Sequence, residues 1–259
     1  MKLQNELESA LTLEHLDAGY EDKIILRDVN LSIHRGEIFA LLGGSGCGKS
    51  TLMRHLIGLN PPLAGRIILG GELFASADET IPENKTRRIL QRLGVMFQSG
   101  ALFGSMPLID NVKLPLQEAT NLPSAVMDEM ALLKLHQVGL GEFADYLPSE
   151  ISGGMQKRAA IARAMVLDPD VLFLDEPSAG LDPITSSELD ELILRLRDAF
   201  GTTIVIVTHE LKSIFKIVDR AAFLDRNSQS VLDVGAPAQL RDQSEHQGVR
   251  GFFHGKSVS

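Results

Sequence analysis

The stretch Glu37–Leu59, "EIFALLGGSGCGKSTLMRHLIGL", combines an apolar run, a glycine-rich turn and a helix-forming segment. Residues 37–42 have the composition of a buried strand, and the segment from Lys49 onward favours a helix. Between them, 43–50 matches the pattern G-x-x-x-x-G-K-[ST]. Its glycines let backbone N–H groups point at phosphate oxygens, and the start of the following helix adds partial positive charge. The stretch therefore predicts a phosphate-binding loop between a strand and a helix.

The residues of this loop have separate expected roles. Lys49 would reach the β- and γ-phosphates of a nucleotide, and Ser50 would supply a hydroxyl to Mg²⁺. Cys47 is interpreted as a small filler at a variable position. Its lysine neighbour predicts a lowered thiol pKa and a nucleotide site that alkylation blocks. The alternative for the whole stretch is a glycine-rich turn with a solvated lysine. The candidate nucleotide-binding residues are Gly43, Gly44, Ser45, Gly46, Cys47, Gly48, Lys49, Ser50 and Thr51.

A second apolar run, "VLFLDEP" at 171–177, ends in two acids. Asp175, at the carboxyl end of a buried strand, would lie beside the phosphate loop and hold Mg²⁺, usually through water. Glu176 would polarise the water that attacks the γ-phosphate. Such a run is common on its own, so it indicates nucleotide hydrolysis only in combination with the phosphate loop.

Short apolar runs alternate with helical patterns along the chain, which is typical of an α/β fold with a parallel sheet. Residues 171–174 and 203–207 predict buried strands, with a helix at 189–200 between them. Residues 11–33 alternate in strand fashion and predict a small antiparallel sheet. By contrast, 99–165 contains mainly helical patterns and reads as a helical insertion.

Composition limits the class of protein. The chain has 259 residues, a net charge of −9 at pH 7 and one cysteine, which excludes an internal disulfide and fits a reducing compartment. The acidic balance argues against nucleic acid as a partner. The first 16 residues lack the apolar core of a signal peptide, and the longest apolar runs fall short of the roughly 20 residues that a membrane span needs. Residues 237–243 favour a helix, and the last dozen residues are expected to be loose.

With these motifs in this order, the chain resembles the ATP-binding cassette (ABC) ATPases over about 11–243. Tyr20 stands where the family has an aromatic that stacks on adenine. Gln98, in "VMFQSG", matches the glutamine that senses Mg²⁺ and the γ-phosphate, and His209, in "IVTHE", matches the switch histidine. The resemblance implies ATP and Mg²⁺ as cofactors and ATP hydrolysis as the activity, with Glu176 and His209 as catalytic residues. It implies that Mg²⁺ is held by Ser50, Gln98 and Asp175.

The resemblance also implies a division of the chain around a P-loop NTPase (RecA-like) core. The core and an N-terminal antiparallel β subdomain would take 11–98 and 166–243. An inserted α-helical subdomain would take 99–165, and 244–259 would be a C-terminal tail.

The segment Ile151–Gln156, "ISGGMQ", resembles the ABC signature motif, usually written LSGGQ, and "AGLDP" resembles the D-loop, with Asp182 as its acid. In the family, the signature completes the ATP site of a second subunit. Two copies would pack head to tail, and each ATP would lie between one copy's phosphate loop and the other's Ser152, Gly153 and Gly154. A helix start with glycine backbone suits an anion. Ser152 as a plain helix N-cap explains the same residue, and both roles are compatible.

Met155 departs from the usual glutamine of the signature but leaves the preceding backbone contacts untouched, so we expect ATP binding to survive. "SGGM" is similar to one branch, the ATPases of Mla-type (MCE) lipid transporters. The stretches 97–123, 147–155 and 175–185 resemble that branch as well.

This branch implies a location and partners. The chain would lie at the cytoplasmic face of the inner membrane, bound to integral-membrane permease subunits. An MCE lipid-binding protein and often a small STAS-domain subunit would join the complex, which moves phospholipid between the inner and outer membranes. The apolar segment after Gln98 fits either a groove for a permease coupling helix or interior packing. Its residues are Ala101, Leu102, Phe103, Met106 and Leu108.

The resulting hypothesis is a pair of chains that closes on two Mg·ATP and reopens on hydrolysis. One alternative is the ATPase of an importer for amino acids or another small solute. A second is a soluble ABC protein acting on DNA or ribosomes, against which the single cassette and acidic charge argue. A third is a nucleotide-gated scaffold with negligible hydrolysis, against which Glu176 and His209 argue.

Overall fold

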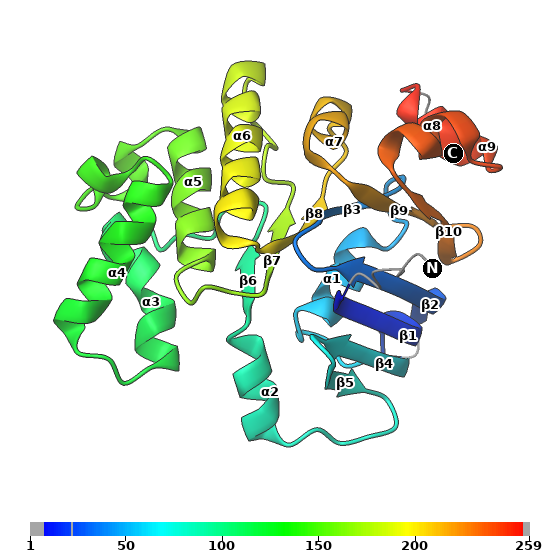
Figure 1. The fold of residues 1–259 in the computed structure, drawn as a ribbon, viewed down its shortest axis with the longest axis horizontal. Coiled ribbons are helices and arrows are strands. Elements are labelled where there is room, and N and C mark those ends of the chain that lie inside the picture. Colours follow the sequence, from blue (N-terminus) through cyan, green and yellow to red (C-terminus); the bar gives the residue numbers. More distant parts are fainter. Residues whose placement is uncertain (1–7, 22, 256–259) are drawn as a thin grey trace, which may run out of the picture.

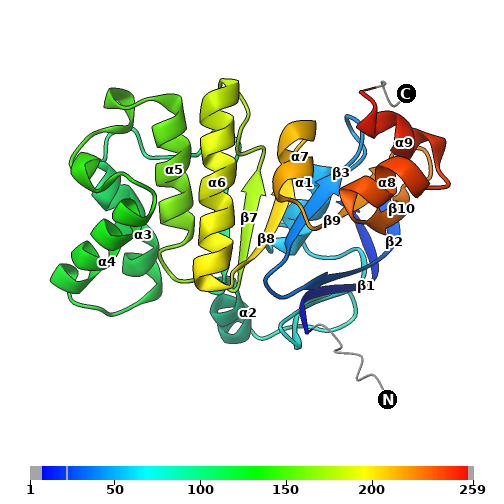
Figure 2. The same cartoon turned by 45° about the horizontal axis from the view of Figure 1, so that its top comes forward.

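The computed structural model describes residues 8–21 and 23–255. Within those residues, no helix has the length and apolar character needed to cross a bilayer. The described strands form two sheets with helices packed around them, as Figures 1 and 2 show. The α/β class predicted from the alternating pattern is confirmed.

The larger sheet has the strand order β10-β9-β3-β8-β7-β6, and every neighbouring pair except β9–β10 is parallel. Strands β3 and β8 are buried along their whole length, which explains why their sequences are continuous apolar runs. The strands of this sheet are β3 (Ile38–Leu42), β6 (Leu93–Met96), β7 (Val171–Asp175), β8 (Thr203–Val207), β9 (Arg220–Asp225) and β10 (Ser230–Gly235).

Helix α1 (Lys49–Leu56) follows β3, α6 (Pro183–Phe200) connects β7 to β8, and α7 (Leu211–Ile217) connects β8 to β9. Helix α6 begins earlier than predicted. The Asp182 carboxylate accepts hydrogen bonds from the first-turn amides, and Pro183 takes the first helical position. Gly201 ends the helix with a φ of +65°.

The smaller sheet is antiparallel and has the order β2-β1-β4-β5. The antiparallel pairing predicted for 11–33 is therefore confirmed. Strands β4 and β5 and helix α2 were not predicted from the sequence. The elements of this part are β1 (Ser9–Tyr20), β2 (Lys23–His34), β4 (Ala64–Leu69), β5 (Glu72–Ser76) and α2 (Glu83–Leu90).

Helices α3 (Leu108–Ala119), α4 (Ser124–Gln137) and α5 (Gly153–Ala164) gather at one end of the molecule, and two short 3₁₀ turns lie between α4 and α5 (Figure 1). They share one buried cluster, in which Val112, Leu135 and Ile161 are fully covered. The same cluster includes Leu189 and Leu192, so α6 joins this end to the larger sheet.

The chain ends with two helices, α8 (Pro237–Gln243) and α9 (Gln247–Phe253). Helix α8 has the predicted bounds, but the expectation of a loose last dozen residues was wrong for α9. Val249 and Phe253 are buried, and the Phe253 ring lies 5.6 Å from the ring of Phe215 on α7. Aromatic burial against α7 fixes α9, while 256–259 lie outside the described residues.

Candidate functional site

The register of the larger sheet brings the predicted site residues to one edge. Leu41 of β3 pairs with Val207 of β8, and Val207 pairs with Asp175 of β7. The phosphate loop, His209 and Glu176 follow these three residues directly or within two positions. Because parallel strands end at the same edge, segments far apart in the sequence converge there.

The phosphate loop has the backbone conformation that its glycines predict. Gly43, Gly46 and Gly48 have φ values of +140°, +74° and +105°. A Cβ on Gly43 would lie 2.3 Å from the carbonyl oxygen of Leu224, so no larger residue fits there. Helix α1 then begins at Lys49 with a first turn that reads Lys-Ser-Thr and carries no acid, which leaves its amide groups suited to phosphate.

Lys49 and Tyr20 both contact this loop or its helix. The Lys49 ammonium donates hydrogen bonds to the carbonyl oxygens of Gly43 (2.8 Å) and Gly44 (3.0 Å), so its charge lies at the loop itself. Thr51 Oγ1 donates to Tyr20 Oη at 3.3 Å, which holds the partly exposed Tyr20 ring beside α1. The structure thus brings Tyr20 to the phosphate loop.

The Cys47 thiol differs from the prediction. It is 2% exposed, and burial raises its pKa, an effect that outweighs the opposing charge of Lys49. The expected lowering of the thiol pKa was therefore wrong, because desolvation disfavours a thiolate more than one ammonium favours it. A buried, protonated thiol fits the filler role.

Asp175 is a half-buried carboxylate at the end of β7. Burial raises its pKa, the neighbouring Glu176 raises it further, and Lys157, Lys49 and Arg54 act in the opposite direction. Within the described ranges, no cluster of three or more His, Cys, Asp or Glu side chains has a metal-binding arrangement. The three donors that the sequence predicts for Mg²⁺ are one carboxylate, one hydroxyl and one amide, all oxygen donors of the kind Mg²⁺ prefers alongside phosphate and water. These are Asp175, Ser50 and Gln98.

Glu176 and His209 lie side by side. His209 Nδ1 is 2.8 Å from Glu176 Oε1, and the Glu176 side chain is 14% exposed against 64% for His209. The other Glu176 oxygen, Oε2, is buried and lacks a hydrogen-bond partner among the described residues. A buried carboxylate oxygen without a partner fits a group that binds a water or substrate atom. The two predicted catalytic side chains are thus in direct contact.

Gln98 lies in the loop after β6, and Met96 of β6 pairs with Leu174, so this loop starts at the same sheet edge as Glu176. The Gln98 side chain is exposed, while its backbone carbonyl accepts a hydrogen bond from the ammonium of Lys157 on α5. Lys157 was not predicted as a site residue from the sequence. Its only signal is a lysine one turn after Gly154 in an otherwise alanine-rich helix.

The signature residues lie elsewhere. Ser152 Oγ accepts a hydrogen bond from the Met155 amide at 3.3 Å and caps α5, which is the N-cap role left open above. A Cβ on Gly154 would lie 2.5 Å from Thr185 Cγ2, so this end of α5 abuts the start of α6. Both Figures 1 and 2 place α5 on the opposite side of α6 from α1. The structure does not bring the signature to the phosphate loop of its own chain.

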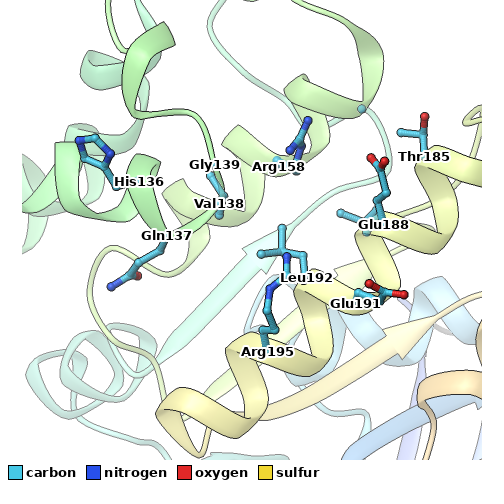
Figure 3. A pocket seen from close by; sticks show the side chains of 12 residues that line it. His136, Gln137, Val138, Gly139, Arg158, Thr185, Glu188, Glu191, Leu192 and Arg195 are labelled. Carbon is cyan, nitrogen blue, oxygen red and sulfur yellow. The ribbon is translucent and has the colours of Figure 1, made fainter.

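Two cavities border these segments. One of about 450 Å³ lies between the end of α4, α5 and α6 (Figure 3), and its lining includes Gly154 and Arg158 of α5 and Glu188 of α6. Another of about 710 Å³ is lined by His209 and by Asp190 of α6. The signature end of α5 and the switch histidine thus both face open space.

The apolar segment after Gln98 was predicted to form either a groove for a coupling helix or interior packing, and its residues divide between exposed and buried positions. Leu108 is fully buried and Leu102 packs partly against the same core, whereas Phe103 is 55% exposed. The backbone N–H of Phe103 donates a hydrogen bond to Asn111 Oδ1, and Asn111 Nδ2 donates one to the carbonyl oxygen of Phe103. One part of the segment is interior packing, and the other presents an anchored aromatic side chain to solvent.

Comparison with known proteins agrees with this geometry. The ABC transporter family profile matches residues 26–179. Two similar proteins are named intermembrane phospholipid transport system ATP-binding protein MlaF. That of Haemophilus influenzae is 36% identical over 96% of this chain and 92% of its own length, and that of Escherichia coli K12 is 40% identical over 90% and 84%. The probable ribonucleotide transport ATP-binding protein mkl of Mycobacterium tuberculosis H37Rv is 38% identical over 96% and 67%.

Two solved structures are similar to the whole fold. One is cbiO1 of Clostridium perfringens, described as part of the ABC transporter complex cbiONQ, with a TM-score of 0.81, 29% identity and coverage of 92% of both chains. The other is the ATP-binding cassette MJ0796, described as a dimer in a post-hydrolysis state bound to ADP and Pi. Its TM-score is 0.76 and its identity 28%, over 87% of this chain and 98% of that one.

Proposed function

This chain belongs to the ABC transporter family as an ATPase that uses Mg·ATP, and we propose that it drives the transport of phospholipid between the inner and outer membranes. The observation that carries this cargo is the likeness to MlaF proteins over 96% and 90% of the chain. We place the chain at the cytoplasmic face of the inner membrane, held there by permease subunits. An MCE lipid-binding protein and a small STAS-domain subunit are proposed as further partners.

The proposal includes a head-to-tail pair of chains. The signature at the start of α5 abuts α6 rather than the phosphate loop, so it is free to complete the site of another copy. Such a pair is isologous, because each copy gives its phosphate loop and its signature to the other. The likeness to MJ0796, which is described as a dimer, supports this arrangement.

Hydrolysis in this pair is assigned to the sheet edge. Lys49 and the first turn of α1 bind the phosphates, and Mg²⁺, held through Asp175, Ser50 and Gln98, would supply charge neutralisation on the phosphate oxygens. The unpartnered Oε2 of Glu176 accepts a proton from the attacking water. His209 contacts Oε1 of the same carboxylate and orients it toward the γ-phosphate side.

Docking on the permease is assigned to the exposed aromatic beside Gln98. Phe103 is 55% exposed and its backbone is fixed by Asn111, so a coupling helix meets a preformed apolar contact. This contact lies five residues after Gln98, which connects the docking surface to the nucleotide site along the chain.

The test purifies the complex through a tag on this chain and measures both bound lipid and turnover. We expect co-purified phospholipid by mass spectrometry and ATP-dependent movement of a fluorescent phosphatidylethanolamine from proteoliposomes that contain the complex. The Glu176→Gln complex should bind ATP, lose phosphate release by about 10²–10⁴-fold and move no lipid.

Two results would contradict the proposal. A complex that hydrolyses ATP but carries no phospholipid above a detergent-matched control, and whose rate rises with an added ribonucleotide or amino acid, would assign a different cargo. Phosphate release by Glu176→Gln at the native rate would remove the role given to Glu176.

A further inference from the structure

Lys157 connects the signature helix to the loop that carries Gln98. It is 9% exposed, lies three residues after Gly154 on α5, and donates its ammonium to the Gln98 carbonyl oxygen. Burial lowers the pKa of this ammonium, and the charges of Asp175 and Glu176 act in the opposite direction. The hydrogen bond to the carbonyl oxygen and the charges of the two acids stabilise this buried ammonium, in addition to the packing of its side chain.

Arg163, further along the same helix, strengthens this connection. Its two terminal nitrogens donate to the carbonyl oxygens of Ala101 and Gly100, each at 2.7 Å. Gly100 and Ala101 have φ values of +74° and +49°, a conformation that alanine rarely adopts. The local backbone alone disfavours this turn, so the bonds from α5 help to hold it.

We propose that Lys157 is a positioning residue that holds the backbone of Gln98 against α5, so that the signature end of α5 and Gln98 move as one unit. This proposal rests on the head-to-tail pair described above. In that pair, Gln98 serves the ATP bound by its own chain and Ser152–Gly154 serve the ATP bound by the partner. The ammonium of Lys157 therefore links the two ATP sites through one helix.

The experiment compares three lysine variants in steady-state ATP hydrolysis. Lys157→Met keeps the aliphatic stem and removes the donor. It should lower kcat by about tenfold or more, because Gln98 loses its preorganised position in the reacting state. The KM for ATP should change by less than about threefold, because the phosphate loop still provides the ground-state binding. Lys157→Arg retains a donor for the carbonyl and should stay within about threefold of the native kcat.

Lys134→Met is the matched control. Lys134 is also a buried lysine of the helical part, 5% exposed, but it pairs with Asp168 and lies over the Phe200 ring, away from Gln98. This variant reports the effect of truncating a buried lysine alone, and its kcat should match the native value once folded protein is counted.

Hydrogen exchange gives a readout that packing loss would not reproduce. Amides of 97–101 should exchange about tenfold faster in Lys157→Met than in the native chain, because this variant releases the loop that carries Gln98. In Lys134→Met the exchange rates of the same amides should be unchanged. Added Mg·ATP should slow exchange at 152–154 in the native pair and fail to do so in Lys157→Met.

The experiments separate a failure of the proposed function from a failure of the positioning role of Lys157. If the native chain neither pairs nor hydrolyses ATP, the proposed function fails. If it does both while Lys157→Met keeps the native kcat and exchange, the positioning role is wrong. Should Lys157→Met not fold, Lys157→Arg decides the matter, because a folded arginine variant below about one tenth of the native kcat would overturn the proposal.

Discussion

Glu176 combines three features that rarely occur together in one residue. Its φ is +45°, its side chain is 14% exposed, and its buried Oε2 lacks a partner among the described residues. The strained backbone is held because the Glu176 amide donates to the Val207 carbonyl at 2.8 Å, which locks it to β8. Strain and an unsatisfied buried oxygen at one position are typical of reacting groups.

Asp190 offers a test of buried charge outside the proposed chemistry. It is 5% exposed, accepts a hydrogen bond from Ser213 Oγ at 3.0 Å, and burial raises its pKa. At a pH above the pKa of Asp190 in both the folded and the unfolded state, the folded protein holds a charged carboxylate that burial disfavours. Asp190→Asn removes this charge and keeps the acceptor, so its melting temperature at pH 7 should exceed the native one by about 2–4 °C.

The difference in melting temperature between Asp190→Asn and the native chain should depend on pH. As pH falls through the raised folded pKa, the native chain gains a proton and stability, whereas Asp190→Asn does not change at this site. The difference in melting temperature should therefore shrink toward acid pH. The exposed Asp145→Asn is the control and should show little difference at either pH. A difference that grows in acid would contradict the assignment.

At the residue scale, the sequence could predict the groups whose chemistry is local. Lys49, Asp175 and Glu176 follow from pattern and strand ends, and the register of the sheet then brings them together. Lys157 and the Cys47 pKa could not be predicted, because both depend on burial by segments distant in the sequence. A continuous apolar run indicates a buried strand, but no local pattern shows that a lysine in a helix or a thiol in a loop is covered by distant segments.

Helix α5 begins with two glycines that differ in their surroundings. A Cβ on Gly153 would have Leu181 Cδ2 at 4.0 Å as its nearest neighbour, whereas one on Gly154 would meet Thr185 at 2.5 Å. Packing therefore explains a glycine at 154 but not at 153. We therefore propose that Gly153 is a glycine because of the phosphate chemistry of the partner site.

The Gly153→Ala variant tests that separation. Stability in urea should be unchanged or raised by about 0.4–1 kcal/mol, because alanine is compatible with the helix and restricts the unfolded chain. The kcat for ATP should fall by at least about tenfold, since the methyl group stands where a backbone N–H approaches phosphate. Gly154→Ala, by contrast, should lose both turnover and stability. Native turnover in Gly153→Ala would mean that this glycine has no part in the ATP site.

At the element scale, strands and helices with strong local signals were predictable. β3, β7, β8 and α8 appear where the sequence placed them. β4, β5, β9 and β10 each include a charged residue and are not continuous apolar runs, so their patterns do not stand out locally. Helix α9 reads as a polar tail, and its burial comes from distant segments, through the Phe215 ring of α7 and the Phe223 ring of β9.

Across the whole molecule, two phenylalanines separate folding from assembly. Phe253 is buried against α7, whereas Phe103 is exposed at the proposed permease contact. Phe253→Ala should lower the free energy of unfolding by about 3 kcal/mol through the cavity that it leaves. Phe103→Ala should change it by less than about 0.5 kcal/mol.

The measurement combines urea unfolding of the isolated chain with capture of the permease complex. Phe103→Ala should unfold like the native chain yet recover less permease in the purified complex. If Phe103→Ala destabilised the isolated chain as much as Phe253→Ala, its exposed position and docking role would both be wrong.

The strand order has a consequence for how the protein is made. β8 lies between β3 and β7 although both precede it in the chain. A growing polypeptide that has emerged only as far as Gly201 therefore has a gap in the middle of its sheet, with the lysine and the acids of the ATP site on separate, unjoined strands. The last part of synthesis closes the gap and adds His209. In the head-to-tail pair proposed above, an incomplete chain therefore lacks the joined ATP site through which it would engage a partner, and pairing is expected only once the molecule is nearly whole.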